Sequence, residues 1–335
     1  MRIGFSLVDL ALGGAQTFLV QLAEGLARRG HSLCYYLAAS PADELHAAPA
    51  LLGRLQACAR RAGRPRELGG CDAIQLDGYH SLRRKLPYLP YWKRCAETYH
   101  SAYSVRRAGP LYPPHRAAVS ARVRAALPVS ARVIYQGVPL PPLPPAGPRP
   151  YEVGILGRLH PVKGHLLFLQ ACEALFRQRG ALNALIIGGG AAPGPYGQRL
   201  EAEIERLRGL GLSIHQTGGL PPEQVPGWLG QVQVLLVTSR DEGFGRMALE
   251  ALACATPVVA NPVGGLPEIV REGEEGFLAR RDDPASFASL AARLLEDEGL
   301  RRRLGLQGRR RVEESFSLEG MLDAYEAFYR EIAGA

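Results

Sequence analysis

The sequence predicts an α/β protein of two domains that face a cleft, each a doubly wound parallel sheet covered by helices on both faces. Short, continuous apolar segments alternate with helical patterns along the 335 residues, as is typical of strands buried on both faces. A proline-rich stretch separates two such series, because seven of the twelve residues from Pro139 to Pro150 are proline. Proline at this density excludes a helix or a central strand and favours an extended spacer.

Each half opens with the same order of strand, glycine-containing loop and helix. In the N-terminal half, a strand over 2–8 and a Gly13-Gly14 turn precede a helix that ends near Arg29. We expect the other strands of this half at 31–37, 73–76, 117–119 and 132–135. In the C-terminal half we expect strands at 153–156, 184–187, 232–237 and 257–260, and helices at 165–179, 197–209, 246–254 and 285–296. A last helix over 318–332 carries an apolar stripe that favours a place in a core.

Composition excludes several classes of protein. No run approaches the roughly 20 apolar residues of a membrane span, and the N-terminus lacks the apolar stretch and cleavage site of a signal peptide. The six cysteines are scattered without metal-ligand spacing, which favours reduced thiols over disulfides or a metal site. We therefore expect a cytoplasmic protein.

The N-terminal part of the chain is basic. Residues 1–145 contain 19 Lys and Arg against 8 Asp and Glu, whereas 146–335 contain 21 against 24. The main basic clusters lie at 54–66, 83–85 and 106–124. A basic half indicates an anionic partner, such as a membrane surface, a phosphate-bearing acceptor or nucleic acid, and a solvated basic face is an equal alternative. No nucleic-acid recognition motif is visible, so we expect no nucleic acid and hypothesise a peripheral position on the inner face of an anionic membrane.

The segment from Val234 to Ala260 carries the most informative chemical pattern. A buried strand leads into the loop TSRDEGFG, and the loop leads into a helix that is apolar almost all round and that we therefore expect to be buried together with its acid. Glu250 is the one acid in the middle of that helix and demands a hydrogen-bonding partner, either a distant arginine or the hydroxyl pair of a ligand. Glu242 stands in the loop, where Gly243 and Gly245 admit a close backbone approach, and the helix start suits a phosphate. These features together suit the sugar, diphosphate and ribose of a nucleotide sugar.

Other loops that follow strands add further candidates. Arg158 and Lys163 are two cations that could clamp a diphosphate and stabilise the charge that grows on it as it leaves. Gly14, at the start of the first helix, either admits a ligand or forms an ordinary tight turn. His100 follows an inferred strand end and is a catalytic candidate, although a lone histidine is more often structural. His80 has a similar position after the preceding strand.

These motifs resemble those of the large retaining glycosyltransferase family 4, also called glycosyl transferases group 1, which has the GT-B fold of two Rossmann-like domains. The resemblance rests on the spacing of Glu242 and Glu250 within SRDEGFGRMALEA and on Gly157-Arg158 with Lys163-Gly164. An N-terminal Gly-Gly-Ala-Gln and an Arg-Arg-Gly-His extend it over nearly the whole chain. It implies an acceptor-side domain, a nucleotide-sugar donor domain and a C-terminal helix that returns to the first, expected at 1–145, 146–316 and 317–335.

The resemblance also implies roles for the candidate residues. Arg158 and Lys163 would hold the diphosphate of the donor, and Glu250 would bind the ribose hydroxyls. Glu242 and His100 would lie at the donor sugar as the catalytic candidates. Near the phosphate and the sugar the resemblance places Gly14, Phe244 and Gly245.

Further implications concern the reaction and two more segments. The anomeric configuration would be retained, and neither a metal nor a cofactor besides the nucleotide-sugar substrate would be required. Glu268 matches an acidic position whose role we expect to be structural. The stretch Gln136-Gly137-Val138-Pro139 departs from the family's Asn-Gly-Val-Asp, and we expect that departure to affect a turn more than the chemistry.

The expected function is transfer of a sugar from a nucleotide-diphosphate sugar, with UDP, GDP and ADP as candidate nucleotides, to a lipid-linked or cell-surface glycan. Two alternatives stay open: another nucleotide-sugar enzyme, such as an epimerase, and a non-catalytic nucleotide-sugar-binding protein. A nucleotide-binding oxidoreductase is disfavoured, because Pro193 stands where the third glycine of GxGxxG would follow Gly188 and Gly190.

Overall fold

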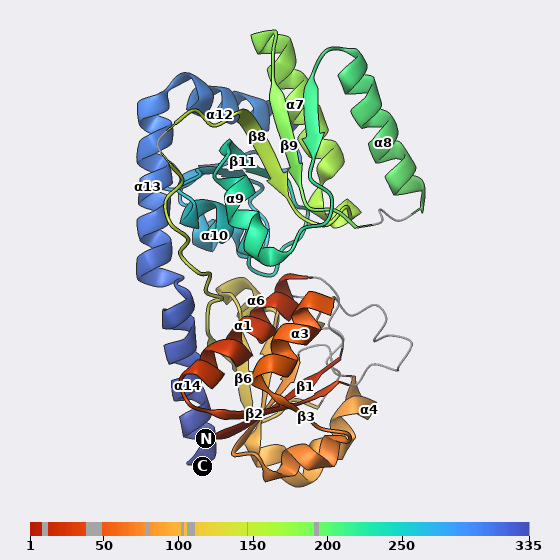
Figure 1. The fold of residues 1–335 in the computed structure, drawn as a ribbon, viewed down its shortest axis with the longest axis vertical. Coiled ribbons are helices and arrows are strands. Elements are labelled where there is room, and N and C mark those ends of the chain that lie inside the picture. Colours follow the sequence, from red (N-terminus) through yellow and green to blue (C-terminus); the bar gives the residue numbers. More distant parts are fainter. Residues whose placement is uncertain are drawn as a thin grey trace. The chain divides into compact units, whose positions relative to one another are not determined.

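The computed structural model describes residues 1–8, 13–37, 49–77, 81–101, 104–105, 111–145, 147–190 and 194–334, which form two compact units (Figure 1). Unit 1 comprises Met1–Gly137 and Leu318–Ala335, and unit 2 comprises Val138–Ser317. The proline-rich stretch therefore groups with unit 2, and the last helix of the chain groups with unit 1. Each unit contains one parallel sheet, which confirms the predicted fold class.

The sheet of unit 1 has the strand order β3-β2-β1-β4-β5-β6-β7, in which the chain winds outward from β1 in both directions. Its strands pair in parallel; Gly4 of β1, for example, lies opposite Cys34 of β2 and Ile74 of β4. The strands are β1 (Arg2–Leu7), β2 (Ser32–Leu37), β3 (Arg60–Arg61), β4 (Ala73–Asp77), β5 (Cys95–Tyr99), β6 (His115–Ala118) and β7 (Arg132–Val133). Strand β3 was not expected, because its two arginines are exposed and carry no apolar signal.

Helices cover this sheet and include the end of the chain. They are α1 (Gly14–Arg28), α3 (Pro49–Cys58), α4 (Leu82–Lys85), α6 (Ala121–Ala125) and α14 (Leu318–Ala333), with 3-10 segments η1 (Pro65–Gly70) and η2 (Leu86–Arg94). Gly25 lets α14 approach α1 closely, because a Cβ there would lie 2.4 Å from the Leu322 side chain. The predicted apolar stripe of α14 is buried: Leu322, Tyr325, Phe328, Tyr329 and Ile332.

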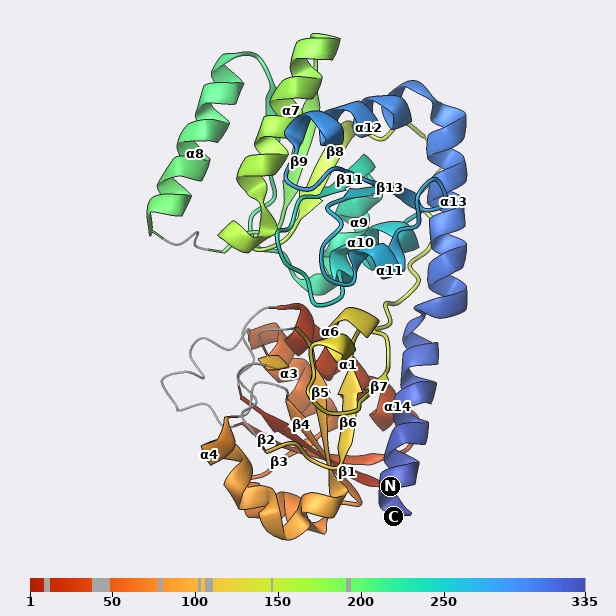
Figure 2. The ribbon, with the colours of Figure 1, turned by 180° about the vertical axis from the view of Figure 1, so that it is seen from behind.

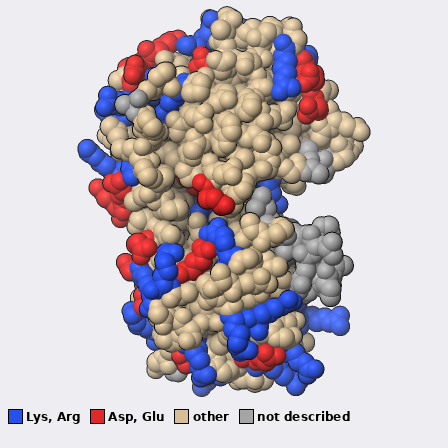
Figure 3. Space-filling view, in the orientation of Figure 1, with Lys and Arg blue, Asp and Glu red and all other residues tan. Residues whose placement is uncertain are grey.

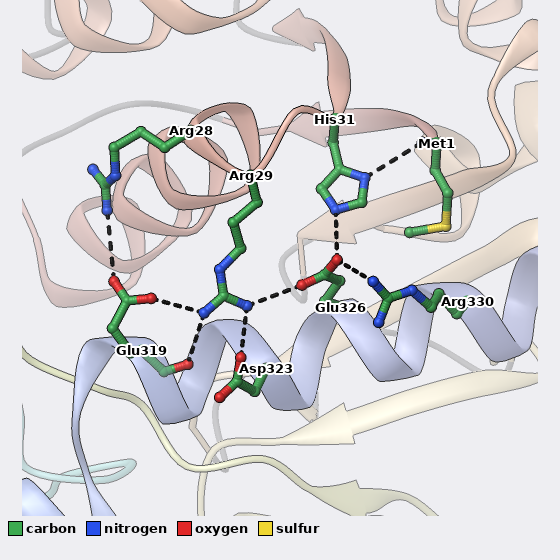
Figure 4. Close-up of polar contacts among 8 residues, drawn as sticks. All are labelled: Met1, Arg28, Arg29, His31, Glu319, Asp323, Glu326 and Arg330. Carbon is green, nitrogen blue, oxygen red and sulfur yellow. Dashed lines mark hydrogen bonds and ion pairs between the residues drawn. The ribbon is translucent and has the colours of Figure 1, made fainter.

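Polar contacts also fix α14 to the first residues of the chain (Figure 4). The guanidinium of Arg29 lies 2.7 Å from Glu319, 2.8 Å from Asp323 and 2.9 Å from Glu326. Glu326 also contacts the His31 ring at 3.0 Å. These pairs join residues nearly 300 positions apart in sequence, so the last helix is an integral part of unit 1.

The sheet of unit 2 has the order β10-β9-β8-β11-β12-β13, again with parallel pairing. Helices α7 and α12 pack side by side over one face of it, and α9 and α10 lie over the other face (Figures 1 and 2). The strands are β8 (Tyr151–Leu156), β9 (Asn183–Ile187), β10 (Ser213–Gln216), β11 (Val232–Val237), β12 (Val258–Ala260) and β13 (Gly276–Leu278). The helices are α7 (His165–Arg179), α8 (Gly194–Gly209), α9 (Val225–Leu229), α10 (Arg246–Ala253), α11 (Leu266–Ile269), α12 (Pro284–Glu296) and α13 (Glu298–Ser315), with η3 (Pro161–Lys163) and η4 (Pro222–Gln224).

Helix α13 was not expected from the sequence, because arginines dominate it. Its contact with the rest of unit 2 is made largely by glycine. A Cβ on Gly305 would lie 2.3 Å from the carbonyl oxygen of Ala255, and one on Gly308 would lie 2.4 Å from the Leu252 side chain. A hydrophobic pattern does not register such contacts, because glycine has no side chain to bury.

Candidate functional site

Two loops at the carboxyl ends of β8 and β11 form one structure in unit 2. The Arg240 N–H donates to the Val162 carbonyl over 2.8 Å, and the Thr238 hydroxyl donates to the Gly164 carbonyl over 3.0 Å. Gly164 has φ +73°, and a Cβ there would lie only 2.1 Å from the Thr238 carbonyl oxygen. Only glycine fits this contact, so Gly164, directly after Lys163, allows the two loops to pack against each other. This is the sheet edge at which open parallel sheets bind ligands.

The joined loops bring two predicted residues together. The Lys163 ammonium lies 2.6 Å from the Glu242 carboxylate, and their side chains are 17% and 10% exposed. The stem of Lys163 packs over Gly157, where a Cβ would lie 3.3 Å from Lys163 Cγ. The pair therefore presents a cation and an anion side by side, both partly open to solvent. Arg158, the second predicted cation, is exposed on the same loop.

Helix α10 carries the second predicted carboxylate. The expected partner of Glu250 exists, but it is not a distant arginine: Arg246, one turn earlier in the same helix, donates to Glu250 over 2.8 Å. Glu250 is 26% exposed at its side chain, so the prediction that it is buried was wrong. The other seven residues of the helix are buried, so the helix is buried almost all round and only the Glu250 side chain reaches solvent. Gly245, at φ +116°, leads the chain into this helix without a side-chain cap.

A glycine pair holds the Glu242 loop from the other side, and sequence reasoning missed it. Gly264 has φ +56°, and a Cβ there would lie 1.5 Å from the Glu242 carbonyl oxygen. A Cβ on Gly265 would lie 2.8 Å from Phe244 Cα. The side chain of Phe244 is itself buried, edge-on to Phe316 at 5.7 Å between ring centroids. Loop position therefore depends on two residues whose only sequence signal is a Gly-Gly dipeptide.

Asn261 and His165 are two further buried polar residues beside these loops that the sequence did not single out. The Asn261 amide follows β12 and donates to the Ser239 carbonyl over 3.0 Å, while its oxygen accepts from the Asp282 N–H. His165 begins α7, and burial, aided by the neighbouring Lys163, lowers its pKa to about 4. The sequence could have indicated Asn261, because it is a polar residue that directly follows a buried strand. Glu268 is half-buried in the first turn of α11.

His100 lies in unit 1, directly after β5, and is buried. Its Nδ1 is 3.2 Å from the Gln136 side-chain nitrogen, and its ring meets Phe18 edge-on at 5.1 Å. With the Gln136 amide donating, Nδ1 accepts and Nε2 carries the ring proton. Nε2 has no hydrogen-bond partner among the described residues. Burial lowers the pKa of His100 to about 4, so the ring is neutral near pH 7.

The contact with Gln136 bears on one expectation. The departure of Gln136-Gly137-Val138-Pro139 from the family pattern was expected to affect a turn more than the chemistry, and the structure places the Gln136 side chain against the ring of the catalytic candidate His100. Gly14, the remaining predicted residue of unit 1, is exposed as the first residue of α1, and Gly13 before it is extended. His80 lies outside the described residues.

Other features of the described residues concern metal binding, membrane-spanning helices and hollows. No three His, Cys, Asp or Glu side chains gather there as a metal ion would require, and no helix there is long and apolar enough to cross a membrane. A hollow of about 740 Å³ lies in unit 2, but its lining, which includes Leu143, Arg149, Arg301 and Leu306, contains no predicted site residue.

Comparison with known proteins places the chain in a family. Residues 145–311 match the family described as glycosyl transferases group 1. The D-inositol 3-phosphate glycosyltransferase of Nocardia farcinica is 39% identical over 192 residues, which are 55% of this chain and 42% of that protein. The N-acetyl-alpha-D-glucosaminyl L-malate synthase of Bacillus anthracis is 36% identical over 31% of this chain and 27% of its own length. The chain thus spans less than half the length of these relatives.

Solved structures share the fold over the whole chain. Anabaena Alr3699/HepE, solved in complex with UDP and glucose, has a TM-score of 0.81 at 20% identity, with 98% of both chains covered. Sucrose-phosphate synthase from Thermosynechococcus elongatus has a TM-score of 0.77 at 20% identity, with 99% of both chains covered. The match over 145–311, nearly all of unit 2, and the two-unit fold show that this chain belongs to the glycosyl transferases group 1 family.

Proposed function

We propose that this protein is a glycosyltransferase that transfers a sugar from a nucleoside-diphosphate sugar to an acceptor. The observation that carries the proposal is the Lys163–Glu242 pair, held at the carboxyl edge of unit 2 within the segment that matches the family. A cation beside a carboxylate suits a diphosphate next to a sugar hydroxyl. UDP is the first nucleotide to test, because Anabaena Alr3699/HepE, which shares the fold, was solved with UDP and with UDP-glucose.

Donor binding would draw on three features of unit 2. Lys163 and Arg158 would bind the diphosphate through charge-assisted hydrogen bonds. The first turn of α10 would add backbone N–H groups and the positive end of the helix dipole. Glu250, partly exposed on the same helix, would accept hydrogen bonds from the ribose hydroxyls, while Arg246 holds the carboxylate in place.

Transfer would depend on the charge that develops as the donor bond breaks. The leaving diphosphate gains negative charge, which Lys163 and Arg158 stabilise more strongly in the transition state than in the ground state. The diphosphate would take the place of Glu242 as the partner of Lys163, and Glu242 would then accept a hydrogen bond from a hydroxyl of the sugar. His100 would contribute a neutral Nε2–H donor to the sugar, because its lowered pKa keeps the ring uncharged. Retention of configuration and independence of metal ions belong to the same proposal, which product NMR and transfer in EDTA would test.

The acceptor is proposed to be a lipid-linked or cell-surface glycan at the inner membrane face in the cytoplasm. The support is the charge of the two units: unit 1 has 20 basic and 12 acidic residues, whereas unit 2 has 20 of each. The sequence overstated this difference, because α14 adds acids to unit 1. The net charge of the chain, +8, nevertheless belongs to unit 1.

The test is a panel of UDP-, GDP- and ADP-linked sugars titrated by calorimetry, without metal, into wild type, Glu250→Ala and Glu201→Ala. Glu201 is an exposed glutamate on α8 and serves as the matched control. We expect one nucleotide class to bind wild type and Glu201→Ala alike, and Glu250→Ala to lose about 10- to 100-fold in affinity. No binding by any member, or equal binding by Glu250→Ala, would contradict the donor site. Binding without transfer to any glycan acceptor would favour a non-catalytic sugar-nucleotide protein.

A further inference from the structure

The crossover between β4 and β5 in unit 1 turns large apolar side chains to solvent. Its helical part comprises α4 and η2, and Leu82, Leu86 and Leu89 are 43%, 50% and 46% exposed. Spacings of four and three residues place them on one side of a helical segment. The outer side of a crossover helix is usually polar, so three exposed leucines on one side of this segment require an explanation.

The exposed leucines are surrounded by basic residues without neighbouring acids in sequence. No Asp or Glu occurs between Asp77 and Glu97. Arg83, Arg84 and Lys93 are exposed on this segment. Figure 3 shows Lys and Arg side chains gathered over the lower part of the view, where Figure 1 draws α4 and the segment after it. The 3-10 segment η1 packs beside η2. With the residue before it, η1 adds the exposed Arg64 and Arg66 and one acid, Glu67.

Not every basic residue of the segment belongs to this surface. Lys85 is fully buried in an ion pair with Glu97, so the predicted surface cluster at 83–85 loses one member. Arg94 turns inward and donates to the carbonyls of Cys71 and Gly69. These inward contacts hold the crossover against the rest of unit 1 and leave Arg83, Arg84 and Lys93 as the exposed cations of the segment.

Aromatic residues complete the segment. Tyr88 is buried and donates from its hydroxyl to Ser6 over 2.6 Å. Tyr91 packs closely on Gly69, and Trp92 beside it is half-buried. Partly exposed Tyr and Trp rings, flanked by Lys and Arg, are typical of protein surfaces at the lipid headgroup level.

We propose that this surface, named here the leucine face (Leu82, Leu86 and Leu89 with Arg83, Arg84 and Lys93), docks unit 1 onto a bilayer that contains anionic phospholipid. The leucines enter the headgroup boundary and the three cations contact lipid phosphates, which accounts for the exposed apolar row and for the missing acids. The proposal concerns binding alone, so its failure would leave the glycosyltransferase proposal intact.

The first test is co-sedimentation of the full chain with vesicles of phosphatidylcholine alone or with increasing phosphatidylglycerol. We expect binding to rise with anionic lipid and to fall about 30-fold in Arg83→Ala/Arg84→Ala, at about five-fold per basic residue. The matched control is Arg302→Ala/Arg303→Ala, two exposed arginines of α13, which should bind within about two-fold of wild type. Equal losses in both double variants, or indifference to phosphatidylglycerol, would overturn the proposal.

The second test uses the two tryptophans, one in each unit. Trp228→Phe leaves Trp92 as the only tryptophan, and Trp92→Phe leaves Trp228. Vesicles with brominated acyl chains should quench Trp92 and leave Trp228 unchanged, because Trp92 lies beside the leucine face. Quenching of both or of neither would contradict the proposal. Sedimentation velocity tests the alternative occupant of the leucine face, a second copy of the chain. A dimer that Leu86→Ser/Leu89→Ser abolishes would assign the leucine face to that second copy.

Discussion

Each unit contains a lysine–glutamate ion pair of nearly the same length, and the two pairs differ in burial. In unit 1, Lys85 and Glu97 lie 2.7 Å apart with both side chains 0% exposed. In unit 2, Lys163 and Glu242 lie 2.6 Å apart and are 17% and 10% exposed. The distance within each pair therefore does not distinguish the two, whereas access to solvent and the surrounding contacts do.

Further hydrogen bonds support the buried pair, although Glu97 Oε1 has no hydrogen-bond partner among the described residues. The Lys85 ammonium also donates to the Leu111 carbonyl, and the Tyr99 hydroxyl donates to Glu97. Among the described residues, Glu242 is the one hydrogen-bond acceptor of the Lys163 ammonium. A fully buried pair is costly to disrupt, and a partly open pair can exchange its partner for a ligand.

The largest expected effect follows from removal of Lys85. Lys85→Met leaves Glu97 buried without its cation, and we expect the free energy of unfolding of unit 1 to fall by about 3–5 kcal/mol. Urea unfolding followed by Trp92 emission, in the Trp228→Phe background, measures unit 1 directly. A loss below about 1 kcal/mol would show that the pair is not structural.

The next largest effect concerns the glycine that supports the Glu242 loop in unit 2. Gly264→Ala would place a methyl group against the Glu242 carbonyl at a positive φ, and we expect a loss of about 3 kcal/mol or more. The control is Gly273→Ala, which also has a positive φ (+75°) but no atom within 4 Å, and should cost about 1 kcal/mol. Trp228 emission in the Trp92→Phe background reports both. Equal losses would refute a role for the close contact.

A pH dependence is expected in unit 1 from Glu97. Burial raises its pKa from 4.5 to about 7, against the opposing effect of Lys85. The folded state therefore binds the proton more tightly than the unfolded state, so this group's stabilisation is full below pH 4.5 and is lost as the pH rises to about 7. We expect the Glu97 contribution to fall by up to about 3 kcal/mol over that range. Glu97→Gln should lack this slope in urea titrations; an unchanged slope would contradict the assignment.

A smaller effect is expected where α14 joins unit 1. Arg29 contacts three carboxylates but is 22% exposed, so Arg29→Ala should cost about 1 kcal/mol. Arg330, which is 64% exposed and among the described residues pairs with Glu326 alone, provides a control with a change near zero. Urea unfolding at low and high salt would measure both, and an Arg29→Ala loss no larger than that of Arg330→Ala would show that the network does not hold α14.

The sequence predicted the fold because continuous apolar segments specify buried parallel strands, and it placed Lys163 and Glu242 in loops at strand ends. Their pairing depends on the order of strands in the sheet, which no local pattern encodes. For the same reason Lys85 was interpreted as part of a basic surface: its partner Glu97 lies on the next strand of the folded sheet. Helix α13 was not predicted because glycines make its contacts. The Glu250–Arg246 pair was not predicted either, although the two residues are one helical turn apart.

The most direct test of the division between the pairs is calorimetric titration of UDP into Lys163→Met, with Lys85→Met as the reference, at a temperature where both variants are folded. We expect Lys163→Met to lose about 10- to 100-fold in affinity while its free energy of unfolding stays within about 1 kcal/mol of wild type. Lys85→Met should bind UDP as wild type does, although it is less stable. Undiminished binding by Lys163→Met, or equal losses in the two variants, would contradict the assignment of the open pair to the donor.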